Sequence, residues 1–117
     1  MFAWLSRLFG STPPAPNWIE VDELRRQLVL ARPPLVIDVR GPDEFDGPLG
    51  HIDGARNIPL PDLPAHQPQL AAESRPLVFV CLTDKRSSQA AAEIAATGAR
   101  DVAVLRGGMK AWREPAA

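Results

Sequence analysis

One short stretch of the sequence combines a nucleophile with positive charge. Cys81, the only cysteine of the chain, is separated by four residues from Arg86, which directly follows Lys85. The thiolate is the nucleophilic form of cysteine, and neighbouring positive charges favour it over the neutral thiol. Nucleophilic chemistry at sulfur is therefore the reaction type that this stretch favours. The alternative interpretation is that Cys81 is a small apolar residue of the core, as many free cysteines are.

The residues on either side place this stretch between a strand and a helix. Before it, the apolar run Leu77–Val80 is typical of a buried strand in a parallel sheet. After it, residues 87–97 are rich in helix-forming residues, and Gly98 follows where a helix commonly ends. The backbone N–H groups of the turn and the positive end of the helix dipole would then stabilise an anionic sulfur. Cys81 is thus expected at the carboxyl edge of an α/β sheet, where ligands bind.

Further motifs stand in order along the chain. They are Asp38-Val39-Arg40, Glu44-Phe45, Gly50-His51-Ile52-Asp53-Gly54-Ala55-Arg56-Asn57-Ile58-Pro59 and Leu105-Arg106-Gly107-Gly108-Met109-Lys110-Ala111-Trp112. Together with the Cys-x-x-x-x-Arg-Ser stretch that begins at Cys81, they resemble the rhodanese-like sulfurtransferases over about residues 17–114. Each motif alone is a weak signal, whereas their shared order and spacing are specific.

The order of apolar and helical segments predicts the fold class. Apolar runs that alternate with helical segments favour an α/β protein, with a parallel sheet and helices on both faces. Strands are expected at Trp18-Ile19, Leu35–Val39, Ala55–Ile58, Leu77–Val80 and Val102–Leu105. The resemblance implies that these five strands lie in the order 1-5-4-2-3. Residues 59–68 contain several prolines and are expected to be irregular, with a short helix over residues 69–74.

The resemblance also implies roles for individual residues. Cys81 corresponds to the catalytic nucleophile of the family, and the substrate-binding loop that follows it comprises Leu82, Thr83, Asp84, Lys85, Arg86 and Ser87. Asp38 is expected to support the site, with either Arg40 or the active-site turn as its partner, although an ordinary strand-end carboxylate is the alternative. His51 is a candidate general base by its residue type, but in the family pattern this histidine belongs to the scaffold.

The activity that the resemblance implies is transfer of a sulfane sulfur. The sulfur would pass from an anionic donor such as thiosulfate to Cys81, giving a persulfide, and then to a nucleophilic acceptor, cyanide or a thiol. Asp84 departs from the glycine or small residue expected in this loop, and this departure leaves the natural donor open.

Two alternative functions remain open at this point. The first is a non-catalytic rhodanese module that carries sulfur or binds a partner. The second is phosphatase or arsenate reductase chemistry, which relatives of this fold perform with a loop one residue longer. The four residues between Cys81 and Arg86 fit a single sulfur better than a tetrahedral oxyanion, and the charge of Asp84 would repel phosphate.

Length and composition narrow the class of protein. The chain has 117 residues and a net charge of −1, which predicts one domain and gives no basic excess for binding nucleic acid. A single cysteine excludes an internal disulfide and an internal resolving thiol, and it fits the reducing conditions of the cytoplasm. With His51 and His66 as the only histidines, the sequence predicts no metal site, and we predict no cofactor.

The first 16 residues differ from the rest of the chain. Residues 1–9 are apolar and aromatic, and residues 10–16 have the Gly, Ser, Thr and Pro content of a linker. We therefore predict a tail and linker over residues 1–16 and a rhodanese-like domain over residues 17–117. The tail is too short to span a bilayer and is a poor signal peptide. Weak contact with a membrane surface or a protein is one interpretation, and a frayed tail or a helix packed on its own domain is the other.

Overall fold

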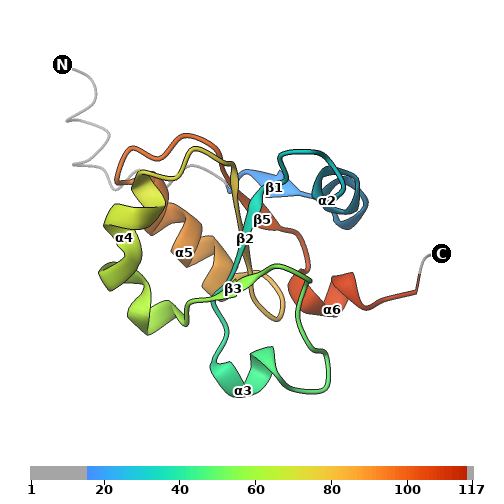
Figure 1. Ribbon diagram of the computed structural model, residues 1–117. Coiled ribbons are helices and arrows are strands. Elements are labelled where there is room, and N and C mark those ends of the chain that lie inside the picture. The colour runs from blue at the N-terminus through green and yellow to red at the C-terminus, as the bar shows by residue number, and fades with distance from the viewer. Residues whose placement is uncertain (1–15, 116–117) are drawn as a thin grey trace, which may run out of the picture.

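The computed structural model describes residues 16–115, which form a five-stranded sheet with helices on both of its faces (Figure 1). The strands are β1 (Trp18–Ile19), β2 (Leu35–Asp38), β3 (Arg56–Asn57), β4 (Leu77–Val80) and β5 (Val102–Leu105). Their order is β1-β5-β4-β2-β3, and every neighbouring pair is parallel. The predicted fold class and strand order are confirmed, and the strand before Cys81 lies at the centre of the sheet.

The helices divide into two layers. On one face lie α4 (Leu63–Ala71) and α5 (Lys85–Ala95), and on the other lie α2 (Val21–Leu28) and α6 (Gly108–Trp112), as Figure 1 shows. The short helix α3 (Pro42–Phe45) follows β2, and the 3-10 turn η1 (Leu60–Asp62) leads into α4. The predicted tail over residues 1–9 lies outside the described residues. Within residues 16–115, no helix has the length and apolar character needed to cross a bilayer.

The central strand shows why its sequence is an uninterrupted apolar run. Leu77 and Phe79 point into the cluster under α4 and α5, whereas Val78 and Val80 point into the cluster under α2 and α6. Successive side chains of a strand face opposite sides of the sheet, so a strand covered on both faces must be apolar at every position. Trp112, the last residue of the final motif, lies buried in the second cluster.

Helix α4 differs from the prediction for this part of the chain. The sequence predicted irregular structure over residues 59–68, but the helix spans Leu63–Ala71. Pro64 lies in the first turn, where a backbone N–H would have no intrahelical partner and its loss costs little. Pro68 lies inside the helix, and the buried side chains of Leu63 and Leu70, two turns apart, hold the segment against the sheet despite the missing donor.

The register of the sheet brings two functional segments together. Asp38, the last residue of β2, pairs with Val80, the last residue of β4. The Val39 N–H donates to the Val80 carbonyl at 2.9 Å, so the segments that follow β2 and β4 leave the sheet side by side. Cys81 therefore follows the carboxyl end of the central strand, next to the segment that contains Asp38 and Arg40.

Candidate active site

The sulfur of Cys81 lies at the amino end of helix α5. Only 1% of the Cys81 surface is exposed, and Ser87 beside it is fully buried. The Ser87 N–H donates to Sγ at 3.3 Å, and the Ser87 Oγ lies 3.2 Å from the same sulfur. The first N–H groups of a helix have no intrahelical acceptor and carry its positive partial charge. The sulfur atom therefore occupies a position suited to an anion.

The rest of the loop forms the rim around this recessed sulfur. Leu82, Thr83 and Lys85 are exposed, whereas Asp84 and Arg86 are half-buried. The Ser87 hydroxyl also lies 3.2 Å from the Asp84 carbonyl oxygen, which it can use as an acceptor. All the loop residues that the sequence proposed thus lie around one short turn, with Cys81 at its base.

Arg86 is paired with a residue from another part of the chain. Its guanidinium donates to both carboxylate oxygens of Glu44, at 2.7 and 3.0 Å. These hydrogen bonds are the main cause that lowers the pKa of Glu44 and raises the pKa of Arg86. The sequence analysis named the active-site turn, which contains Arg86, as one possible partner of Asp38. In the structure the partner is Glu44, and the pair links α5 to α3.

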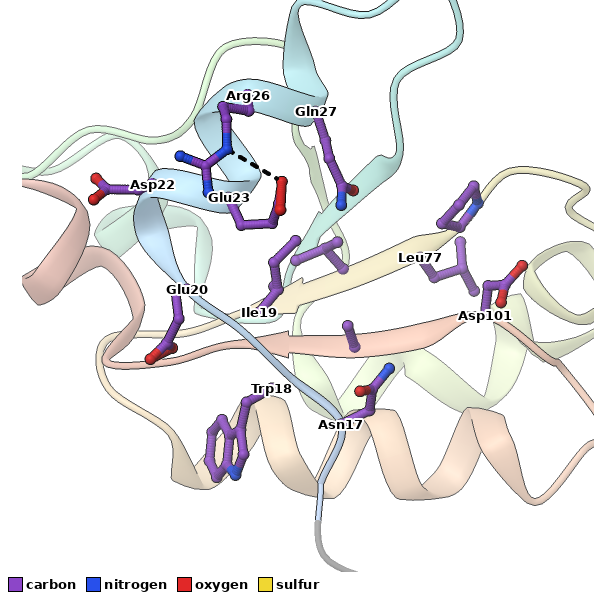
Figure 2. A pocket seen from close by; sticks show the side chains of 13 residues that line it. Asn17, Trp18, Ile19, Glu20, Asp22, Glu23, Arg26, Gln27, Leu77 and Asp101 are labelled. Atoms are coloured by element: carbon purple, nitrogen blue, oxygen red, sulfur yellow. Dashed lines mark ion pairs between the residues drawn. The ribbon is translucent and has the colours of Figure 1, made fainter.

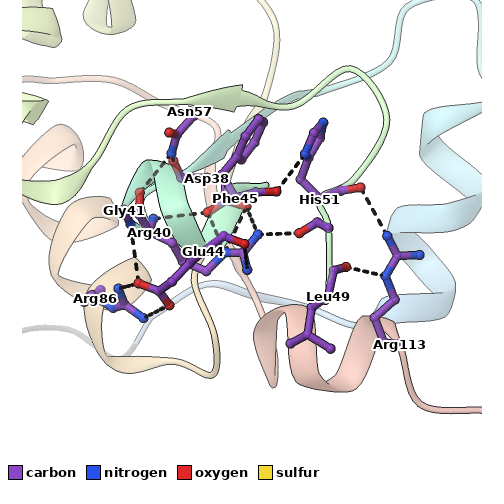
Figure 3. A network of polar contacts seen from close by, with 11 residues as sticks. Asp38, Arg40, Gly41, Glu44, Phe45, Leu49, His51, Asn57, Arg86 and Arg113 are labelled. Atoms are coloured by element: carbon purple, nitrogen blue, oxygen red, sulfur yellow. Dashed lines mark hydrogen bonds and ion pairs between the residues drawn. The ribbon is translucent and has the colours of Figure 1, made fainter. Parts of the chain in front are cut away.

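Asp38 and Arg40 form a buried ion pair close to this contact (Figure 3). Both side chains are almost fully buried, and Arg40 Nη2 lies 2.8 Å from Asp38 Oδ2. Arg40 also donates to the carbonyl oxygens of Glu44 at 3.0 Å and Gly50 at 2.7 Å. Arg40, rather than the active-site turn, is thus the partner of Asp38. The pair fixes the segment that carries Glu44 and therefore acts on the loop indirectly.

His51 belongs to the same supporting layer. Its ring stacks on Phe45 with a centroid distance of 3.6 Å, and its Nδ1 lies 2.9 Å from the Phe45 carbonyl oxygen. The backbone carbonyl of His51 accepts a hydrogen bond from Arg113 (Figure 3). These contacts support the expectation that His51 is part of the scaffold.

Asp84 contacts the turn between β5 and α6. Its carboxylate oxygen accepts a hydrogen bond of 2.7 Å from the Gly107 N–H. Two further backbone bonds join the same segments, from the Met109 N–H to the Cys81 carbonyl at 2.8 Å and from the Lys110 N–H to the Leu82 carbonyl at 3.0 Å. The active-site loop therefore rests on the first residues of α6.

The remaining polar regions offer no competing centre within the described residues. No group of three or more His, Cys, Asp or Glu side chains in residues 16–115 is arranged to hold a metal ion. A pocket between α2 and the sheet is lined by residues that include Trp18, Glu23, Arg26 and Leu77 (Figure 2). Leu77 begins the strand that Cys81 follows, so this pocket lies toward the opposite end of β4 from the sulfur.

Sequence reasoning missed two partners of the loop. In the sequence, Glu44 and Gly107 stand out only as members of motifs. The presence of the acidic residue Glu44 in a motif close to the Asp38 segment was a signal that could have identified it, because opposite charges at the same edge of the sheet can pair. The Gly107 contact is made by a backbone N–H, and nothing in its residue type pointed to it.

Comparisons with known proteins agree with this arrangement. The profile of the rhodanese-like domain family matches residues 20–115. The thiosulfate sulfurtransferase GlpE of Shewanella oneidensis is 39% identical over 88 residues, which cover 75% of this chain and 84% of that protein. The uncharacterized protein YqhL of Bacillus subtilis is 40% identical over 77 residues, which cover 66% of this chain and 59% of YqhL.

A solved structure gives the same result for the fold. A rhodanese-like domain protein from Staphylococcus aureus superposes with a TM-score of 0.75 at 28% identity, covering 84% of this chain and 92% of that chain. The family match extends from α2 to α6 and covers the strands β2, β3, β4 and β5, and it includes the Cys81 loop and both segments that support the loop. The chain belongs to the family of rhodanese-like domains.

Proposed function

We propose that this protein is a sulfurtransferase that carries a sulfane sulfur as a persulfide on Cys81. The observation that carries the proposal is the position of the only cysteine. Its sulfur accepts a hydrogen bond from the Ser87 N–H at the amino end of α5. Relatives named thiosulfate sulfurtransferase, 37–39% identical to this chain, support this class of reaction.

The first half of the reaction loads the sulfur. The Cys81 thiolate attacks the outer sulfur of thiosulfate, and a new S–S bond forms with the electron pair of the thiolate. The S–S bond of the donor breaks, and its electron pair leaves with sulfite. Sulfite is a stable anion, so its departure needs no general acid. The product is a persulfide anion on Cys81, and the α5 N–H groups are placed to stabilise that charge.

The second half returns the cysteine to its starting state. Cyanide or a thiolate attacks the outer sulfur of the persulfide, and the electron pair of the broken S–S bond returns to the Cys81 sulfur. The chain has no second cysteine that could perform this attack. The acceptor must therefore come from outside the chain, and the two halves together predict ping-pong kinetics.

The loop residues Leu82–Ser87 would receive the donor. Lys85 is exposed and supplies positive charge for an anionic donor. The charge of Arg86 is largely engaged by Glu44, so we assign Arg86 mainly to holding the loop. Asp38 and Arg40 act as supports of the segment that carries Glu44.

The test is the mass of the intact protein after reaction with thiosulfate in the absence of an acceptor. The expected result is a gain of one sulfur atom, removed again by cyanide, and no gain in Cys81→Ser. Steady turnover with thiosulfate and cyanide would distinguish an enzyme from a module that only carries sulfur. If Cys81 alkylates readily yet gains no sulfur from thiosulfate, mercaptopyruvate, glutathione persulfide or polysulfide, the proposed function is wrong.

A further inference from the structure

We infer, building on the proposed sulfurtransferase function, that Asp84 is a positioning residue. Through its bond to the Gly107 N–H it holds the active-site loop on the amino end of α6 and leaves the Ser87 N–H free for the sulfur of Cys81. A side chain that departs from the family pattern thus acts in this chain as a fixed support for the loop.

The first observation is the direction in which the Asp84 carboxylate points. Asp84 is the residue directly before α5, where an aspartate side chain ordinarily accepts from the second or third N–H of its own helix. Its side chain makes no such bond here. The third N–H is that of Ser87, and it donates instead to Cys81 Sγ at 3.3 Å. The bond of 2.7 Å to Gly107 therefore keeps a competing acceptor away from the donor that the sulfur uses.

The second observation is the close backbone contact between the active-site loop and the segment that Asp84 binds. Gly107 and Gly108 both have positive φ, 79° and 58°, a conformation that side chains strongly disfavour. A Cβ on Gly108 would overlap with the Cys81 carbonyl oxygen, so the backbones of the turn and the loop are in direct contact. Asp84 adds a side-chain bond to the two backbone bonds that already join these segments.

This arrangement affects both the binding of the sulfur donor and the hydrogen bond to the Cys81 sulfur. A glycine at this position could not make the bond to Gly107, and a residue that capped α5 would compete with the sulfur for Ser87. The Asp84 carboxylate accepts a short hydrogen bond from the Gly107 N–H, which holds the charged group on the side of the loop that faces α6. Asp84 thus belongs to the geometry of the site, and the negative charge that the sequence analysis regarded as unfavourable for anions is secondary to that role.

Two substitutions separate the bond from the charge. Asp84→Asn removes the charge but keeps an oxygen that accepts from Gly107, whereas Asp84→Ala removes both. Since both variants lose the same charge, the difference between them reports the hydrogen bond. The readout is the rate of alkylation of Cys81 by neutral iodoacetamide as a function of pH. We expect the half-maximal pH of Asp84→Ala to lie above that of Asp84→Asn by about one unit, the size expected for one weakened hydrogen bond to an ion.

The same variants are then compared in sulfur transfer. In a single turnover with saturating thiosulfate, at a pH below both half-maximal values, we expect Asp84→Ala to form the persulfide more slowly than Asp84→Asn by a factor of at most about ten, because the fraction of thiolate falls with the same shift. Should Asp84→Ala fail to fold, Asp84→Ser replaces it. Serine caps helices well, so it would supply the competing acceptor for Ser87 and give the same shift.

Opposite results would overturn the inference. If Asp84→Asn and Asp84→Ala show the same alkylation profile and the same transfer rate, the bond to Gly107 does not position the loop. If both accelerate transfer equally, Asp84 acts only through its charge. Alkylation requires no sulfur donor, so the comparison remains decisive even if the wild-type protein forms no persulfide and the proposed function fails.

Discussion

At the scale of the residue, the charged groups of the active-site loop differ in their contacts. Arg86 and Asp84 are engaged by Glu44 and Gly107 respectively, at 2.7 Å in both cases. Lys85 is exposed and lies directly after the turn. We therefore expect Lys85 to supply most of the long-range attraction for an anionic donor, whereas Arg86 and Asp84 determine the shape of the loop.

Replacing Lys85 by alanine should weaken the capture of thiosulfate. A unit charge several ångströms from an anion in a water-like medium changes the interaction by about 0.5–1 kcal/mol, so kcat/KM should fall about two- to fivefold at low salt. The difference from wild type should shrink as salt is raised, since exposed charges are screened. Arg100→Ala is the matched control, because this exposed cation follows the far end of α5. Equal losses in both variants would contradict a local role.

Replacing Glu44 by glutamine should alter the pH dependence of stability. The pKa of Glu44 is lowered below 4.5 in the folded state, chiefly by Arg86, so its contribution to stability is present above pH 4.5 and is lost as the pH falls through the folded value. Both partners are more than a third exposed, so the free energy of unfolding near pH 7 should fall by no more than about 1 kcal/mol.

The measurement for Glu44 is thermal unfolding of wild type and variant from pH 7 to pH 3. The two curves should converge at acid pH. Asp43→Asn is a suitable control, since it removes a charge from the same helix at an exposed position. A difference that persists unchanged at pH 3 would show that Glu44 stabilises the fold by another means.

At the scale of the element, the site is a junction of three segments at the carboxyl edge of the sheet. The loop after β4 holds the sulfur, the segment after β2 supplies Glu44, and the turn after β5 supplies Gly107. Parallel strands end at the same edge, so neighbouring strands bring their following loops together. The buried pair of Asp38 and Arg40 fixes the second of these segments.

Arg40→Ala should therefore be strongly destabilising. It would leave the Asp38 carboxylate buried without its partner and would also remove the donors to the Glu44 and Gly50 carbonyls. Breaking a buried ion pair in this way costs about 3–5 kcal/mol. Urea denaturation would measure the loss, and the double variant Asp38→Asn/Arg40→Met should lose less than Arg40→Ala. A loss below about 1 kcal/mol in Arg40→Ala would mean that the pair does not hold the segment.

At the scale of the whole molecule, two apolar clusters on opposite faces of one sheet support the site. The cluster under α4 and α5 includes Phe79 and Ile94, and the cluster under α2 and α6 includes Leu24 and Trp112. The β4 strand contributes to both clusters, and Cys81 itself packs in the first. We propose that the rhodanese-like domain begins near residue 17, as the sequence predicts.

Deleting residues 1–15 should accordingly leave this domain folded and active. Residues 10–16 have the composition of a linker and the family match begins at residue 20, so the unfolding temperature should remain within about 2 °C, which corresponds to less than about 0.5 kcal/mol for a domain of this size. Calorimetry and thiosulfate turnover of the shortened chain would check both parts. A fall of more than about 5 °C, on the order of 1 kcal/mol, would show that the segment packs into the core.

The sequence by itself determined the fold class and the place of Cys81 between a strand and a helix. An apolar run, a polar turn and a helical segment follow one another around Cys81, and each is specified by neighbouring residues. The motif order, through its resemblance to a known family, added the strand order. The prediction of irregular structure over residues 59–68 was wrong at α4. The loss of a backbone hydrogen bond at Pro68 can be read from the sequence, whereas the burial of Leu63 and Leu70 against the sheet depends on distant segments.

The tertiary structure alone decided which partners the charged residues of the site have. Arg86 could have paired with Asp38 or Glu44, and Asp84 could have capped its own helix. In the structure, Arg86 pairs with Glu44, 42 residues away, and Asp84 binds the N–H of Gly107, 23 residues away. Charged side chains can bind any complementary group within reach, and reach depends on how the strand ends converge in space. For this reason the sequence identified the residues of the loop, whereas only the folded chain determined what each of them does.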